Sequence, residues 1–133
     1  VAPHLWVGRR PGPMHIPNGA IVVDMTAEFP VHPALRTPSN LVLLPTLDAR
    51  SPGPLCLLQS ARLLQNAGRP IYLHCAQGHG RSATLAAVLM VLREDAPTVD
   101  EAMRQMQRFR PAVHLHSVQR RDAIEAVHMA TAF

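Results

Sequence analysis

The sequence predicts an α/β domain with a mostly parallel central sheet of four to five strands flanked by helices. Short apolar runs that fit buried strands alternate with longer segments of helical spacing, and prolines and glycines separate them. This alternation favours parallel strands with helices covering both faces. The length of 133 residues predicts one domain over 1–133, and the start at Val1 leaves open its excision from a longer chain.

Four apolar runs are the predicted strands. They cover 4–7, 20–23, 40–44 and 71–74. We expect Asp24 to be a turn former at the end of the second strand. Pro45 should stop the third strand, which we expect to be buried, because proline cannot donate to a sheet.

The predicted helices cover 55–67, 82–93, 99–109 and 117–131. Gly68 suits the C-terminus of the first, and Ser117 is the expected cap of the last. Thr98 and Glu101 have the spacing of a capping box, so they should open the third. The helix over 82–93 is apolar almost all round, which predicts a buried central helix.

Composition excludes two classes of function. The net charge is +4 and all thirteen basic residues are Arg, but one Trp, one Tyr and three Phe give no aromatic interleaving for stacking bases. Nucleic acid is therefore not an expected partner. The longest apolar run, over 83–92, is too short to span a bilayer, and no secretory signal is visible.

The most informative motif is H-C-x5-R-S, which runs from His74 to Ser82. It follows a predicted strand and opens a predicted helix, so its backbone N–H groups can surround an oxyanion at the helix N-terminus. The motif begins with a cysteine and closes with an arginine. A thiolate nucleophile and a guanidinium clamp would then face the same phosphate.

Each position of the motif has an expected role. Cys75 is the nucleophile, since a helix N-terminus and a nearby arginine favour the thiolate. Arg81 binds two phosphoryl oxygens, Ser82 donates a hydrogen bond to the sulfur, and His74 anchors the loop from behind. Gly78 and Gly80 should provide positive φ angles. The phosphate-binding positions are Ala76, Gln77, Gly78, His79, Gly80 and Arg81.

Asp48 is the candidate general acid. It lies in a loop after a predicted strand parallel to the cysteine strand, so both groups should meet at one edge of the sheet. Its carboxyl can protonate the leaving oxygen and later activate water. Arg50 could position substrate nearby, although a solvated side chain is the simpler interpretation.

These residues carry a family resemblance. The chain resembles a cysteine-dependent protein tyrosine phosphatase of the dual-specificity class, in particular compact bacterial members. The signature H-C-x-x-G-x-x-R-S is matched in full over 74–82. The segments 5–8, 22–26 and 44–48, and Arg110-Pro111 with Gln119, resemble other parts of the family. The resemblance implies the fold, a phosphocysteine mechanism without cofactor, and a phosphorylated protein or small phosphate ester as substrate.

Alternatives remain. Relatives that act on polyphosphoinositides often carry Lys where this chain has Ala76 and His79, yet a lipid phosphate stays open. So do a weak phosphate-binding module and another loop-cysteine enzyme, such as a sulfurtransferase. Eight histidines suggest the possibility of a metal site, but no C-x-x-C or H-E-x-x-H pattern is present. A reduced Cys75 favours the cytoplasm or a cytoplasm-facing domain of a longer protein, and Cys56 is either a core residue or a redox partner of Cys75.

Overall fold

The computed structural model describes residues 2–9, 16–26, 41–76 and 79–132. Its elements are β1 (Leu5–Gly8), β2 (Ile21–Thr26), β3 (Leu41–Thr46), α1 (Pro54–Gln65), β4 (Ile71–His74), α2 (Arg81–Leu92), α3 (Val99–Phe109) and α4 (Ser117–Ala132). Every predicted strand and helix is present. The predicted bounds differ from the observed ones by at most three residues.

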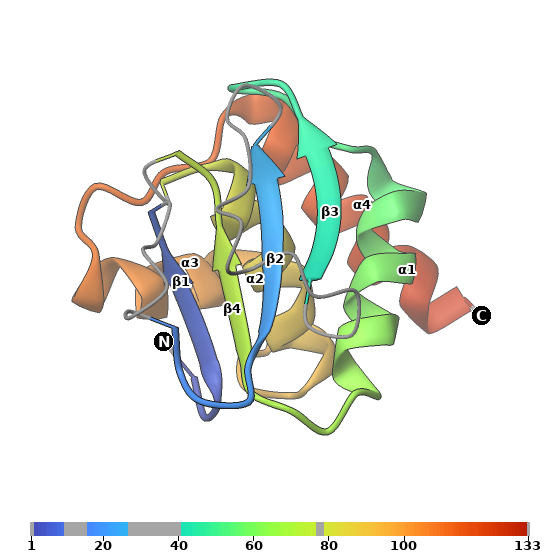
Figure 1. Ribbon diagram of the computed structural model, residues 1–133. Helices are drawn as coiled ribbons and strands as arrows, with labels where there is room; N and C mark the ends of the chain where they lie inside the picture. Colours follow the sequence, from blue (N-terminus) through green and yellow to red (C-terminus); the bar gives the residue numbers. More distant parts are fainter. Residues whose placement is uncertain (1, 10–15, 27–40, 77–78, 133) are drawn as a thin grey trace.

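The strands form one parallel sheet in the order β1-β4-β2-β3. Figure 1 shows the four strands side by side. β4 is internal, with Ile71 in register with Leu5 of β1 and with Ile21 of β2. Because all pairs are parallel, the carboxyl ends of the strands meet at one edge. The chain leaves β3 toward Asp48 and β4 toward Cys75 at this edge, as predicted.

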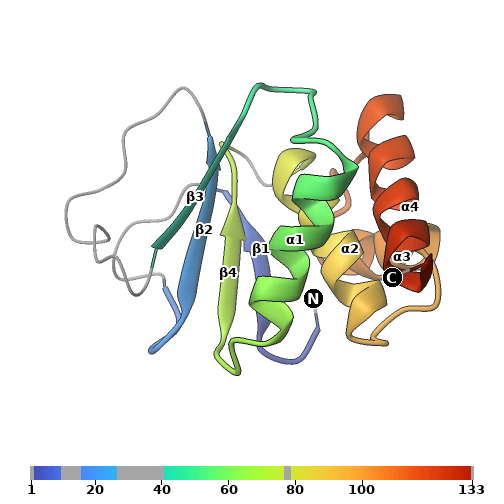
Figure 2. The ribbon, with the colours of Figure 1, turned by 90° about the vertical axis from the view of Figure 1, so that its right-hand side faces the viewer.

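The four helices of the described residues all lie on the same side of the sheet (Figure 2). The prediction of helices on both faces is therefore wrong for this part of the chain. α1 is the crossover from β3 to β4 and covers this face. The three later helices follow the last strand; α2 and α4 pack against α1, and α3 packs against α2, so all four share one side.

α2 is the centre of the helical layer, as predicted. Residues 81–90 are all buried. The helix contacts β1 and β4 on the sheet and also α1, α3 and α4. A helix enclosed on all sides is held rigidly, which fixes the two motif residues of its first turn, Arg81 and Ser82.

β3 departs from the prediction of a buried strand that stops at Pro45. It is an edge strand, it continues to Thr46, and the Leu43 side chain is 56% exposed. The register with β2 shifts, because Asp24 pairs with Leu43 but Thr26 pairs with Thr46. Proline is tolerated at such a bulge on an edge, where its missing N–H removes no ladder bond.

The helix ends partly follow the predicted caps. The Thr98 side chain accepts a hydrogen bond from the Glu101 N–H at 3.1 Å, which opens α3 as predicted. Gly68 has φ +64° beyond the end of α1. Arg120 of α4 forms two hydrogen bonds to the Asp100 carboxylate of α3, at 2.9 and 2.8 Å. These bonds hold the pKa of Asp100 below its ordinary value.

Within the described residues, no helix has both the length and the apolar character that crossing a membrane requires.

Candidate active site

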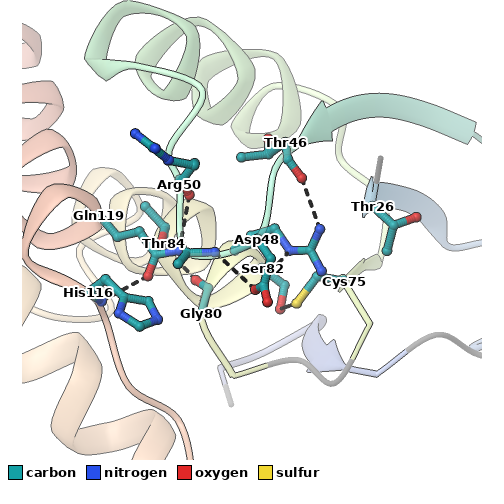
Figure 3. Close-up of polar contacts among 12 residues, drawn as sticks. Thr26, Thr46, Asp48, Arg50, Cys75, Gly80, Ser82, Thr84, His116 and Gln119 are labelled. Carbon is teal, nitrogen blue, oxygen red and sulfur yellow. Dashed lines mark hydrogen bonds and ion pairs between the residues drawn. The ribbon is translucent and has the colours of Figure 1, made fainter. Parts of the chain in front are cut away.

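Cys75 follows β4 directly, at the carboxyl edge of the sheet. Its side chain is buried, and its Sγ lies 3.3 Å from the Oγ of Ser82 in the first turn of α2. Figure 3 shows the two side chains pointing toward each other. The pair that the motif predicts is therefore brought together. A hydroxyl in this position can donate a hydrogen bond to a thiolate sulfur.

Arg81 lies beside this pair, although it is buried and charged. Its Nη1 donates a hydrogen bond to the Thr46 carbonyl at 2.9 Å. Its Nε lies 3.9 Å from Oδ1 of Asp48. The guanidinium thus connects the start of α2 to the end of β3. Figure 3 shows Asp48 and Thr46 in the same neighbourhood as Cys75, so the predicted acid and the predicted nucleophile share one site.

Asp48 lies in a tight turn on the surface. The Arg50 N–H donates to the Leu47 carbonyl at 3.0 Å, which closes the turn, and Ala49 has φ +61°. The Asp48 side chain is 87% exposed, and its Oδ1 accepts a hydrogen bond from the Ala49 N–H. The Arg50 side chain is exposed, in agreement with the simpler interpretation of that residue. An exposed carboxyl at this edge is accessible to a substrate.

Gly80 is the N-cap of α2, but not for the predicted reason. Its φ is −134°, so the expected positive φ is wrong here. The glycine is needed for close packing instead. A Cβ at this position would lie 3.2 and 3.3 Å from the two amide atoms of the Gln119 side chain. The preceding carbonyl, of His79, accepts a hydrogen bond from the His114 N–H at 2.7 Å.

The remaining predicted phosphate-binding positions are only partly placed. Ala76 follows Cys75 and is partly exposed. Gln77 and Gly78 lie outside the described residues, so the predicted ring of N–H groups and the expected positive φ of Gly78 stay predictions.

His74 is buried at the end of β4, and Asp24 of β2 lies beside it. The prediction that Asp24 forms a turn is wrong. β2 continues to Thr26, so Asp24 is a buried strand residue and not a turn former at a strand end. Its Oδ1 lies 4.0 Å from Nε2 of His74 and accepts hydrogen bonds from the Thr26 N–H and hydroxyl, at 2.8 and 2.6 Å. Register explains the pairing, since Asp24 is opposite His74 in the sheet. The anchoring role of His74 stays a prediction.

Gln119 is a site residue whose role the sequence did not indicate. It is fully buried in the first turn of α4. Its Oε1 accepts a hydrogen bond from the His116 N–H at 2.9 Å, and its Nε2 donates to the Arg50 carbonyl at 3.0 Å. The helix begins at Ser117, so His116 occupies the cap position that was predicted for Ser117. A glutamine three residues after a helix cap is the only local signal for this arrangement.

The sequence also suggested a redox partner for Cys75 and a metal site. Cys56, in α1, and Cys75 are not joined by a disulfide. The His114 and His116 rings pack edge to face, with centroids 5.6 Å apart. Across the described ranges, no group of three or more His, Cys, Asp or Glu side chains is placed to hold a metal ion.

Comparison with known proteins identifies the family. A family model described as "PTP-SAK: Swiss Army Knife protein, DSP-PTPase phosphatase domain" matches residues 20–132. The chain belongs to this DSP-PTPase family. The resemblance to cysteine-dependent protein tyrosine phosphatases is thereby confirmed, and with it the phosphatase class of the domain.

One human relative, "Phosphatidylglycerophosphatase and protein-tyrosine phosphatase 1", is 34% identical over 86 residues. The match covers 64% of this DSP-PTPase chain and 39% of that protein. Human DUSP28 has a TM-score of 0.78 at 14% identity, covering 98% of this chain and 96% of its own. PTPMT1 in complex with PI(5)P has a TM-score of 0.71 at 22% identity, covering 86% and 80%. These two structures support the fold.

Proposed function

We propose that this DSP-PTPase domain hydrolyses phosphomonoesters through a phosphocysteine on Cys75. The observation that carries the proposal is the contact between Cys75 Sγ and Ser82, beside an Arg81 that also approaches Asp48. A nucleophile, an anion clamp and an acid at one edge of a parallel sheet are the parts that phosphoryl transfer needs.

The first step transfers the phosphoryl group to sulfur. The Cys75 thiolate attacks phosphorus, an S–P bond forms, and the bond from phosphorus to the ester oxygen breaks. The carboxylic acid of Asp48 gives its proton to the departing oxygen, which leaves as an alcohol or phenol. Arg81 and the N–H groups of residues 76–81 bind the oxygens of the transferring group, whose charge they stabilise.

The second step releases phosphate. The Asp48 carboxylate takes a proton from a water molecule, whose oxygen attacks phosphorus, and the S–P bond breaks. The sulfur leaves as a thiolate. The Ser82 hydroxyl, 3.3 Å from Sγ, stabilises that thiolate by a hydrogen bond. The thiolate and the carboxylic acid are both restored after inorganic phosphate departs.

We infer that the substrate is a phosphoprotein carrying phosphotyrosine, phosphoserine or phosphothreonine. The 87% exposure of the Asp48 side chain supports this substrate class, because an acid at the surface is also within reach of the shorter phosphoserine and phosphothreonine. A second candidate is a lipid phosphate ester. It is favoured by the name of the human relative, which includes phosphatidylglycerophosphatase, and by the 69% exposed Leu47 beside the acid.

A substrate panel tests the proposal and separates the two candidates. The wild-type chain is assayed with phosphotyrosine and phosphothreonine peptides, with p-nitrophenyl phosphate, and with phosphatidylglycerophosphate in vesicles, and Cys75→Ser sets the background. We expect phosphate release from both peptides above that background. Release from the vesicles alone would assign the lipid candidate, and turnover of none of these substrates would contradict the proposed function.

Asp48→Asn tests the acid separately. We expect kcat/KM to fall by about 10²-fold for phenyl phosphate, whose leaving oxygen needs a proton, and by much less for p-nitrophenyl phosphate. A series of substituted phenyl phosphates measures this as a steeper dependence of log kcat/KM on the pKa of the leaving phenol. Equal losses across the series would remove Asp48 as the acid.

A further inference from the structure

We propose that Gln119 is a positioning residue that holds the acid of the reaction in place. The inference rests on the proposed function, because it assigns Gln119 a role in the protonation by Asp48. The proposal is that the Gln119 side chain ties the turn over 47–50 to the start of α4, against the backbone of Gly80, and that this tie sets where the Asp48 carboxyl lies.

Few contacts within the turn over 47–50 fix the position of the Asp48 carboxyl. The Asp48 side chain is 87% exposed, so packing does not fix it. Ala49 has φ +61°, a left-handed conformation that is unfavourable for an alanine. The turn's own hydrogen bond, from the Arg50 N–H to the Leu47 carbonyl, constrains its shape but not its place on the protein. Contacts from outside the turn have to supply that placement.

Two buried side chains hold the backbone on either side of Asp48, in addition to the approach of Arg81 Nε to its carboxyl at 3.9 Å. On one side, Arg81 donates to the carbonyl of Thr46, two residues before the acid. On the other, Gln119 donates to the carbonyl of Arg50, two residues after it. The carboxyl of Asp48 therefore lies between two backbone anchors. Both anchoring side chains are buried, which makes their positions well defined.

The two anchoring side chains, Arg81 and Gln119, differ in what else they bind. In the proposed reaction, the Arg81 guanidinium binds the oxygens of the phosphoryl group as well. Gln119 has no such role, because both ends of its amide form hydrogen bonds within the protein. Its Oε1 accepts from the His116 N–H while its Nε2 donates to Arg50 (Figure 3). Gln119 can therefore hold the turn in the same place before, during and after each chemical step.

The same amide also lies against Gly80, the N-cap of α2. A Cβ on Gly80 would come within 3.2 Å of its Oε1, so the glycine backbone and the amide are in close contact. The Gln119 side chain thus lies between the acid turn and the start of α2 and keeps the two at a fixed separation. A misplacement of about 1 Å can cost two orders of magnitude in rate, so this separation matters for proton transfer.

Gln119→Met tests the proposal, because methionine keeps the length and volume of the side chain but donates no hydrogen bond to Arg50. The matched control is Gln65→Met. Gln65 also donates from Nε2 to a backbone carbonyl, that of Leu92, at 3.0 Å, but near the opposite end of the sheet. The readout is the ratio of kcat/KM for phenyl phosphate to kcat/KM for p-nitrophenyl phosphate. This ratio does not depend on how much of the variant is folded.

We expect Gln119→Met to lower the ratio by about tenfold, because the acid is misplaced and the poor leaving group depends on it most. Gln65→Met should leave the ratio at its wild-type value. The proposal is overturned if Gln119→Met keeps the wild-type ratio, whatever its total activity, or if Gln65→Met lowers the ratio equally.

A double variant keeps this result separate from the proposed function. If Gln119 acts through Asp48, then adding Gln119→Met to Asp48→Asn should produce no further fall in the ratio. A further tenfold fall in the double variant would show that Gln119 acts elsewhere and would overturn the inference. An Asp48→Asn variant with a wild-type ratio would instead contradict Asp48 as the acid, and the wild-type and Cys75→Ser assays test the nucleophile independently.

Discussion

Cys75→Ser should abolish phosphate release while leaving the fold and phosphate binding intact. The hydroxyl of serine is far less ionised at neutral pH than a thiol beside a helix N-terminus, so the nucleophile is lost. We expect kcat for p-nitrophenyl phosphate to fall by about 10⁴-fold or more, as for removal of a nucleophile in other hydrolases. The substitution is nearly isosteric, and a hydroxyl can keep the contact with Ser82 at 3.3 Å.

Two measurements accompany this variant. The first is the binding of inorganic phosphate, measured as the rise in melting temperature on adding it. This rise should be similar in wild type and Cys75→Ser because the other anion-binding groups are unchanged. Rapid acid quench of the wild type with substrate, followed by mass spectrometry, should detect phosphate on the peptide that contains Cys75. Full activity of the serine variant would contradict the phosphocysteine mechanism.

Arg81→Lys should have the second largest effect. Lysine keeps the charge but cannot present two parallel N–H donors to a phosphoryl group. It also loses the geometry of the bond to the Thr46 carbonyl, so the acid turn loses one of its two anchors. We expect kcat/KM to fall by about 10³-fold, comparable with the loss of an oxyanion donor in other enzymes. Steady-state kinetics with p-nitrophenyl phosphate provide the measurement.

The control for Arg81→Lys is Arg62→Lys on α1. Arg62 also donates to a backbone carbonyl, that of Ala130 in α4, but it belongs to no part of the site. Its kcat/KM should stay within about threefold of wild type, as expected for a change outside the reacting geometry. The role of Arg81 would be contradicted if its lysine variant lost no more activity than this control.

The sequence predicted those parts of the site that depend on local spacing. Cys75, Arg81 and Ser82 belong to one strand–loop–helix segment, so their proximity follows from the length of the loop. Asp48 needed one further step, namely that parallel strands end at a common edge. That step succeeds because the 40–44 run was recognised as a strand, even though its true end is Thr46.

The parts that were missed depend on contacts between distant segments. Asp24 is not a turn residue because β2 continues to Thr26, and the order of the strands, which the local sequence does not contain, places it opposite His74. Gly80 was explained by a positive φ because its close neighbour, Gln119, is 39 positions away in the sequence. The prediction that Pro45 ends the strand fails because an edge strand cannot be recognised before its neighbours are known.

The burial of α2 has a consequence for how the two halves of the site move. Ten successive buried residues begin with Arg81, so the amides of this helix should exchange with solvent only when the whole domain opens. The turn of Asp48 is at the surface, and its amides can exchange through small local openings. The position of Arg81 and Ser82 is thus lost only when the whole domain unfolds. The proton donor, Asp48, belongs to a region that opens locally and on a faster timescale.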